Sequence, residues 1–272
     1  MPRMTAALRQ PHADTPVLLR QDADGIATLT LNRPAARNAL SVALMTALQD
    51  QIDAIGDDKA VKVVILAASG PAFCAGHDLR EVRANPSRAF YEALFDQCSR
   101  LMLSLIRLPK PVIAQVHGVA TAAGCQLVAT CDLAVAADDA RFATPGVNIG
   151  LFCSTPMVAL TRAVGAKPAM EMLLTGDLID APTAKSYGLI NRVVPPAELA
   201  PATMALARQI ASKSPLTLKI GKEAFYRQRE LGVEQAYAYA SRAMTENMMA
   251  RDAELGIDAF IAKKPQPDWQ GE

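Results

Sequence analysis

Three nearly continuous apolar runs, separated by stretches of helical length, place the strongest constraint on how this chain folds. The runs are VKVVILAA at residues 61–68, PVIAQVHG at 111–118 and DLAVAA at 132–137. Strands that are apolar on both faces are typical of sheets covered on both sides, and connections of helical length join parallel neighbours. The alternation predicts an α/β fold, with a mostly parallel sheet and helices packed against it.

The segment before these runs carries signals for a hairpin and a helix. Asp24 and Gly25 lie between two strand-like runs and form a strong turn signal. Apolar residues at helical spacing follow over residues 41–58, where Ser41 is a suitable N-cap and Gly56 a suitable end. We therefore expect an antiparallel hairpin ahead of the parallel strands.

The second half of the chain has a different pattern. From about residue 155 it is mostly helical, and only INRVV at 190–194 looks like a strand. No low-complexity linker separates the halves. We expect a flexible N-terminal tail over residues 1–14, an α/β core over 15–195 and a helical C-terminal region over 196–272.

Composition supports a large buried core and argues against a nucleic-acid-binding surface. Apolar residues make up 51% of the chain, and 28 basic residues against 27 acidic ones give a net charge of +1. Nucleic-acid binding requires clustered positive charge, which this sequence lacks. No apolar run approaches the length of a membrane span. The cysteines form no C-x-x-C pair and the histidines are scattered, so we expect no metal site.

The N-terminal residues bear on cellular location. Arg3 and Arg9 occur without an acidic residue over positions 1–13, which is a weak similarity to a transit peptide. A flexible tail is the simpler interpretation. We expect a cytoplasmic protein, with the mitochondrial matrix as the alternative if the source is eukaryotic.

Two loops, at residues 74–79 and 120–126, have features that suit catalysis. Each follows an apolar strand and opens a helix. Helix N-termini carry unpaired backbone N–H groups and the positive end of the helix dipole. Two such ends directed at one carbonyl oxygen would stabilise the oxyanion of an enolate. Strand–glycine–helix turns are also common as purely structural features, so spacing alone leaves both interpretations open.

Four stretches carry a resemblance to a known family. They are LNRPAARNAL, SGPAFCAGHDLREV, KPVIAQVHGVATAAGCQLVATCDLAVAADDARFATPGVNIGL and EMLLTGDLIDAPTAKSYGLINRVV, and they occur in this order. Together they resemble the enoyl-CoA hydratase/isomerase (crotonase) superfamily over about residues 15–268. The resemblance implies a spiral of ββα units with a C-terminal helical trimerisation region, and assembly as a homotrimer or a dimer of trimers. It also implies an acyl-CoA thioester substrate and no metal or redox cofactor, since coenzyme A is part of the substrate.

The resemblance also assigns roles to individual residues. The backbone N–H groups of His77 and Ala123 match the two oxyanion donors, the second at a position where glycine is usual. Alanine keeps that donor in place if its φ is negative. The other matching positions lie near coenzyme A, the last two beside its nucleotide: Arg37, Ala39, Ala75, Asp78, Leu79, Phe260 and Lys263.

Two acids that hydratases of this family use are absent from this sequence. Gln126 stands at the first glutamate position, and Gly146, directly after Pro145, stands at the second. A carboxylate accepts a proton at neutral pH, whereas an amide does not, and each positioned acid or base is worth roughly 10²–10⁴ in rate. The sequence predicts weak or noncanonical hydratase activity. Glutamates at both positions together are expected to raise that activity if the rest of the site is intact, and single replacements are expected to do less.

Four other side chains near the loops are candidates to replace the acids. We favour a structural role for each: a helix cap for Ser154, packing for Cys153, a backbone role for His77 and a structural carboxylate for Asp78. His117, at a strand end, is expected to be hydrogen-bonded or in the core.

Three functions remain open from the sequence. The first is an acyl-CoA enzyme of the hydratase/isomerase type that uses the backbone oxyanion hole with noncanonical proton transfer. The second is a catalytically inactive acyl-CoA-binding or regulatory protein. The third is an enzyme of the same fold that hydrolyses a thioester or moves a double bond.

Overall fold

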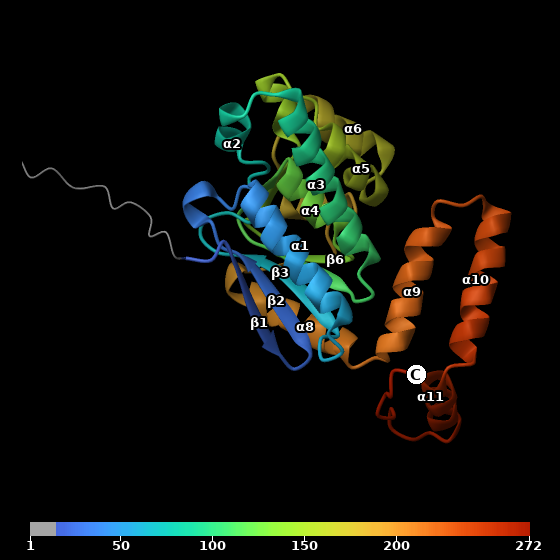
Figure 1. Ribbon diagram of the computed structural model, residues 1–272. Helices are drawn as coiled ribbons and strands as arrows, with labels where there is room; N and C mark the ends of the chain where they lie inside the picture. Colours follow the sequence, from blue (N-terminus) through green and yellow to red (C-terminus); the bar gives the residue numbers. More distant parts are fainter. Residues whose placement is uncertain (1–14) are drawn as a thin grey trace, which may run out of the picture.

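A six-stranded sheet organises residues 15–272, which the computed structural model describes (Figure 1). Its first two strands are antiparallel and all other neighbours are parallel, which confirms the predicted sheet. The predicted tail over residues 1–14 lies outside the described residues. In sheet order the strands are β1 (Leu18–Ala23), β2 (Ile26–Leu31), β3 (Val63–Ala68), β4 (Val112–Val116), β6 (Leu133–Ala137) and β9 (Arg192–Val194).

A second, three-stranded sheet stands beside the first and was not predicted. It pairs β5 (Val119–Thr121) with β7 (Arg141–Ala143) in parallel and β7 with β8 (Ile179–Asp180) antiparallel. The prediction that 190–194 is the only strand beyond residue 155 is therefore wrong. Strands of two or three residues are too short to show a period of two, which explains why the pattern misses them.

Helices cover both faces of the large sheet. Alternate residues of β3 point to opposite sides: Val64 and Leu66 join the core beneath α1 (Val42–Asp57), α3 (Arg88–Arg107) and α4 (Ala123–Thr130). Val63 and Ile65 join a second core that is closed by α8 (Leu199–Ala211). Burial on both faces explains why these strands read as continuous apolar runs.

The local signals near the N-terminus are mostly confirmed. Asp24 and Gly25 have φ of 54° and 76° and form the hairpin turn between β1 and β2. The Ser41 hydroxyl caps α1 by accepting from the Leu44 amide at 3.2 Å. Gly56 does not end this helix, which continues to Asp57.

The last three helices reach away from the sheets (Figure 1). No residue of α9 or α10 is buried, and Asp252 is the one buried residue of α11. Helix α8 also belongs to the predicted C-terminal region, yet it packs on the large sheet. The remaining helices of the described chain are α2 (Leu79–Ala84), α5 (Ser154–Ala163), α6 (Ala166–Thr175), α7 (Ala181–Ser186), α9 (Pro215–Gln228), α10 (Val233–Met248) and α11 (Arg251–Ile261), and its 3-10 turns are η1 (Pro34–Ala36), η2 (Pro145–Ile149) and η3 (Pro196–Glu198).

A largely enclosed polar cluster connects α9 to the end of the large sheet. The Lys222 ammonium donates to the Asp132 carboxylate at 2.7 Å and to the carbonyls of Leu105 and Lys110, each at 2.9 Å. The Tyr226 hydroxyl donates to the other Asp132 oxygen at 2.8 Å. Only 7% of the Lys222 side chain is exposed. The cluster satisfies its own hydrogen bonds, as buried charges require.

Replacing Lys222 with Met is expected to lower the free energy of unfolding by about 3 kcal/mol, because it leaves a largely buried carboxylate without its cation. Urea denaturation measures the change. Arg88→Met is the matched control, because its pair with Glu92 is exposed on both sides and such pairs contribute about 0.5 kcal/mol or less. Equal losses in the two variants would contradict this account.

Candidate active site

The two loops singled out in the sequence lie side by side and are hydrogen-bonded to each other. The Cys74 amide donates to the Val119 carbonyl at 3.1 Å, and the Thr121 amide donates to the Cys74 carbonyl at 2.9 Å. These two bonds form a parallel bridge between Cys74 and Ala120. Since β3 and β4 are parallel neighbours, their carboxyl ends deliver both loops to the same edge of the sheet.

Two glycines allow this close approach. A Cβ atom at Gly124 would lie 2.1 Å from the Cys74 carbonyl oxygen, so no side chain fits there. Gly76 has a φ of 95°, which favours glycine, and a Cβ atom there would lie 3.4 Å from the Ala123 amide nitrogen. The backbone of the first loop therefore passes within a few ångströms of the start of α4.

The two backbone N–H groups predicted as oxyanion donors have no acceptor within the described protein. Among residues 15–272, neither the His77 amide nor the Ala123 amide donates a hydrogen bond to protein. Ala123 is the first residue of α4, where helical N–H groups have no acceptor in their own helix. Its φ is not positive, whereas that of Ala122 is 50°. Alanine thus meets the backbone condition for a donor at this position.

Gln126 lies inside the protein, one turn into α4. It is 5% exposed, and its side-chain oxygen Oε1 accepts from the Cys98 thiol of α3 at 4.0 Å. It lines a cavity of about 620 Å³ between α3, α4, α5 and α9. The apolar wall of this cavity includes Met102, Ile106 and Val158. The sequence identified Gln126 but gave no sign of the cavity, because its walls come from four separate helices.

Gly146 is enclosed by the segment that follows it. A Cβ atom at this position would lie 2.6 Å from the Leu151 carbonyl oxygen and 2.9 Å from the Cys153 sulfur. The Leu151 amide also donates to the Gly146 carbonyl at 2.9 Å, which holds the segment in place. The expectation that glutamates at 126 and 146 restore hydratase activity does not fit this structure, because residues 151–153 occupy the space of the second side chain.

Asp78 is held by structural contacts. Its carboxylate pairs with the Arg33 guanidinium at 2.8 Å and accepts from the amides of Arg80 and Glu81 at the start of α2. Burial acts to raise the pKa of Asp78, but the Arg33 guanidinium and the two amides outweigh it and lower the pKa. This carboxylate caps α2, as a structural role requires.

Three other predicted side chains lie as follows. His117 has its Nε2 atom 2.8 Å from the Gly70 carbonyl oxygen, which confirms a hydrogen-bonded role. Cys153 is buried and packed, as predicted. The predicted cap of α5 by Ser154 is wrong: Ser154 is already inside the helix, and its hydroxyl lies 3.4 Å from the Phe152 carbonyl oxygen.

The imidazole of His77 is unusual among the described polar side chains. Both ring nitrogens are buried and lack a hydrogen-bond partner. The ring packs edge-on against Phe95 of α3, with 5.6 Å between ring centroids. Burial lowers the pKa of His77, and the nearby Leu40 carbonyl opposes this without bonding either nitrogen. The sequence offered no reason to expect a buried ring without a partner.

The residues expected near coenzyme A divide into two groups. The Ala75 amide donates to the Arg37 carbonyl at 3.1 Å, so these two positions meet at the first loop. Ala39, Asp78 and Leu79 adjoin the same loop, because the Leu40 amide donates to the Gly76 carbonyl at 2.7 Å. The second group consists of Phe260 and Lys263 at the end of α11. Helix α11 and helix α2 lie at opposite ends of the molecule (Figure 1).

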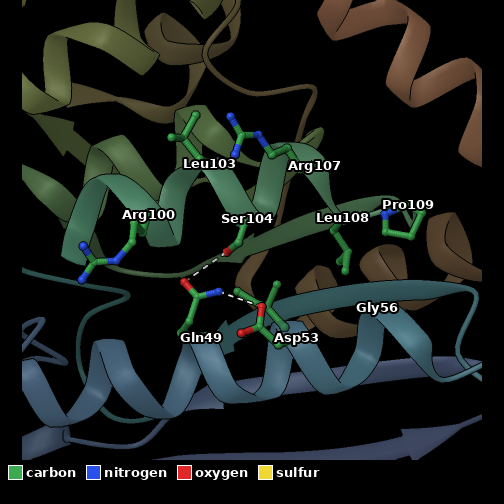
Figure 2. Close-up of a pocket in the computed structure, with 10 residues that line it drawn as sticks. Gln49, Asp53, Gly56, Arg100, Leu103, Ser104, Arg107, Leu108 and Pro109 are labelled. Carbon is green, nitrogen blue, oxygen red and sulfur yellow. Dashed lines mark hydrogen bonds between the residues drawn. The ribbon is translucent and has the colours of Figure 1, made fainter. Parts of the chain in front are cut away.

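A separate groove of about 580 Å³ lies between α1 and α3 (Figure 2). Gln49 crosses it, donating to Asp53 at 2.8 Å and accepting from Ser104 at 3.4 Å. Arg100 and Arg107 stand on the α3 side of this groove. None of the predicted site residues lines it, so the joined loops and not this groove form the candidate site.

The parallel sheet, the joined loops and the helical extension define a crotonase-type α/β protein. The family model for enoyl-CoA hydratase/isomerase matches residues 21–272. The chain is 49% identical over 249 residues to human enoyl-CoA hydratase domain-containing protein 3, mitochondrial, covering 92% of this chain and 82% of that protein. This chain therefore belongs to the enoyl-CoA hydratase/isomerase family.

Solved structures agree with this assignment. The crystal structure of enoyl-CoA hydratase from Mycobacterium smegmatis gives a TM-score of 0.92 at 54% identity, covering 94% of this chain and 99% of that one. The crystal structure of human enoyl-CoA hydratase domain-containing protein 3 gives a TM-score of 0.90 at 47% identity, covering 93% and 100%. Similarity along nearly the full length means that the sheets, the loops and the C-terminal helices share one architecture with these structures.

Replacing Gly124 with Ala is expected to destabilise the protein by about 1–3 kcal/mol, because the new methyl group meets a backbone carbonyl that cannot move freely. Thermal or urea unfolding measures this. Gly221→Ala is the matched control, since a Cβ atom there meets nothing within 4 Å and alanine favours a helix by about 1 kcal/mol. A Gly124→Ala protein as stable as Gly221→Ala would refute the close contact between the loops.

Replacing Gly146 with Glu is expected to lower stability and to add no hydratase activity, alone or together with Gln126→Glu. The cause is the contact with the Leu151 carbonyl, which forces the backbone to shift. Steady-state hydration of crotonyl-CoA, with unfolding measured in parallel, tests both parts. The single variant Gln126→Glu is the control. A stable double variant with raised hydratase activity would show that residues 151–153 give way.

Proposed function

We propose that this protein binds acyl-CoA thioesters and polarises the thioester carbonyl with the backbone N–H groups of His77 and Ala123. The observation that carries the proposal is the pair of free amides on two loops that hydrogen bonds hold together. Enolate formation places negative charge on the carbonyl oxygen, and preformed donors stabilise that charge without reorganising. Membership of the enoyl-CoA hydratase/isomerase family supports an acyl-CoA substrate.

The same site is poorly equipped to add water to a double bond. Hydration needs groups that accept and donate protons, but Gln126 is neutral and the Gly146 position has no room for a side chain. The proposed activity is therefore enolate formation, with weak or noncanonical hydratase activity. We propose no metal or redox cofactor, since the chemistry requires only the donors and the thioester itself.

Assembly and location follow from other features of the described chain. Helices α9–α11 expose large apolar side chains such as Val233, Met249 and Phe260, which are 76%, 80% and 85% exposed. An exposed apolar surface of this kind favours burial against other subunits, so we propose a homotrimer or a dimer of trimers.

We propose a cytoplasmic location, or the mitochondrial matrix if the source is eukaryotic, because a human relative is named a mitochondrial protein.

Two alternatives belong to different classes. A catalytically inactive acyl-CoA-binding or regulatory protein is favoured by the enclosed Gly146 and the neutral Gln126, because both reduce proton transfer and neither blocks the donors. A thioesterase or isomerase of the same fold would use the polarised carbonyl for a different product. Mass spectrometry of the products separates thioester hydrolysis and double-bond migration from hydration, whereas binding without any product favours the inactive protein.

The proposal predicts that the carbonyl resonance of butyryl-CoA labelled with ¹³C at C1 moves downfield when the thioester binds, because two donors withdraw charge from the oxygen. NMR of the wild-type protein measures this shift. Gly124→Ala is expected to abolish it by separating the loops, while Gly221→Ala keeps it. Crotonyl-CoA hydration is expected to be at least about 10²-fold slower than in a family member with both glutamates. Binding without a carbonyl shift would refute the oxyanion hole.

A further inference from the structure

We propose that the imidazole of His77 is the group that takes the proton from the α-carbon of the bound thioester. This inference rests on the proposed function, because it requires a polarised carbonyl next to the ring. It assigns two tasks to one residue: the main-chain N–H of His77 binds the oxygen, and its side chain transfers the proton. The ring would thereby supply the proton transfer that Gln126 and Gly146 do not provide.

The first observation is the unsatisfied state of the ring. A neutral imidazole has one N–H donor and one nitrogen acceptor, and both ring nitrogens of His77 are buried without a partner among the described residues. Leaving a buried polar group unpaired costs about 1–3 kcal/mol. Unpaired buried groups in folded proteins are rare and need an explanation, of which a catalytic role is one. A bound substrate would give one of these nitrogens a partner.

The second observation is where the ring lies. It contacts Phe95 of α3, and Gln126 contacts Cys98 three residues further along the same helix. Three residues span about 4.5 Å of helix axis, so His77 and Gln126 approach α3 about one turn apart. The imidazole and the Gln126 side chain therefore contact adjacent turns of α3.

The same wall continues into the cavity. Phe95 shares one side of α3 with Ser99, Met102 and Ile106, which line the 620 Å³ cavity beside Gln126. In this proposal, an acyl chain that extends from the joined loops to this cavity runs along α3 past Phe95, against which the imidazole packs. Phe95 is 42% exposed, so packing in the core does not fix its ring. Rotation of such a side chain is fast and would open the ring to a substrate.

The other candidate groups are occupied elsewhere. Asp78 is paired with Arg33 and caps α2. Burial raises the pKa of Cys153 despite an opposing contact with the Gly146 backbone, so this thiol stays protonated at neutral pH. Burial has the opposite effect on His77 and lowers its pKa, which keeps the imidazole neutral and able to accept a proton.

The step conserves atoms and charge. The Cα–H bond of the thioester breaks, and its electron pair forms the carbon–carbon double bond of the enolate. The carbonyl π electrons move to the oxygen, which the amides of His77 and Ala123 bind. The proton forms an N–H bond on the imidazole, which becomes a cation beside the enolate. In D₂O the imidazolium exchanges this proton for a deuteron and returns the deuteron to the α-carbon.

The experiment measures exchange of the α-protons of butyryl-CoA in D₂O by proton NMR. His77→Ala and His77→Phe both keep the backbone amide, and the second also keeps an aromatic ring against Phe95. We expect both variants to exchange at least about 10²-fold more slowly than the wild type. His117→Ala is the control, because it removes a histidine that is bonded to the Gly70 carbonyl outside the site. It is expected to exchange at the wild-type rate.

The ¹³C carbonyl shift, recorded for each protein, separates the possible failures. A retained shift with slowed exchange in both variants supports the proposal. If the shift is retained but either variant exchanges at the wild-type rate, the role of the imidazole is overturned and the oxyanion hole remains. The same holds if the wild type shows the shift but no exchange. A variant that loses the shift together with exchange shows that the ring supports the loop, which also overturns it. No shift in the wild type refutes the proposed function itself.

Discussion

The hydrogen bond between the Cys74 carbonyl and the Thr121 amide, at 2.9 Å, is the contact on which the candidate site depends. It joins the loops that follow β3 and β4, so the residues just before α2 lie beside the start of α4. Gly124 makes this contact possible, because any side chain there would meet the same carbonyl oxygen. In the proposed function, polarisation of one oxygen by two amides depends on this contact and on no charged side chain.

In a site built from main-chain amides, oxyanion binding and proton transfer are carried out by different groups. In the proposed oxyanion hole, binding depends on loop geometry, and alanine at position 123 meets the backbone condition because its φ is not positive. Proton transfer depends on side chains, and Gln126 and Gly146 stand at the two positions where the family resemblance leads us to expect acids. Leu151 and Cys153 enclose Gly146, so the segment that follows this residue fills the space that a side chain there would need.

The sequence predicted what depends on local pattern and missed what depends on distant contacts. The continuous apolar strands, the hairpin turn and the Ser41 cap follow from neighbours in the chain, and all were correct. The two-residue strand β8 is too short for any period to appear. The clash at Gly146 arises from a carbonyl five residues away whose direction no pattern encodes. The unpartnered ring of His77 likewise results from packing against α3.

The neutral character of the buried wall also affects which intermediates the site stabilises. A glutamate at position 126 would place a carboxylate close to the developing enolate, and like charges in a poorly solvated space repel strongly. Gln126 brings no charge, and its amide N–H groups can donate to an oxygen. Compared with a glutamate, glutamine at this position provides no base, and in the proposed site it lowers the cost of forming an anion nearby. A site of this kind holds an enolate better than it delivers water to an alkene, provided that a neutral group such as the His77 imidazole takes up the proton.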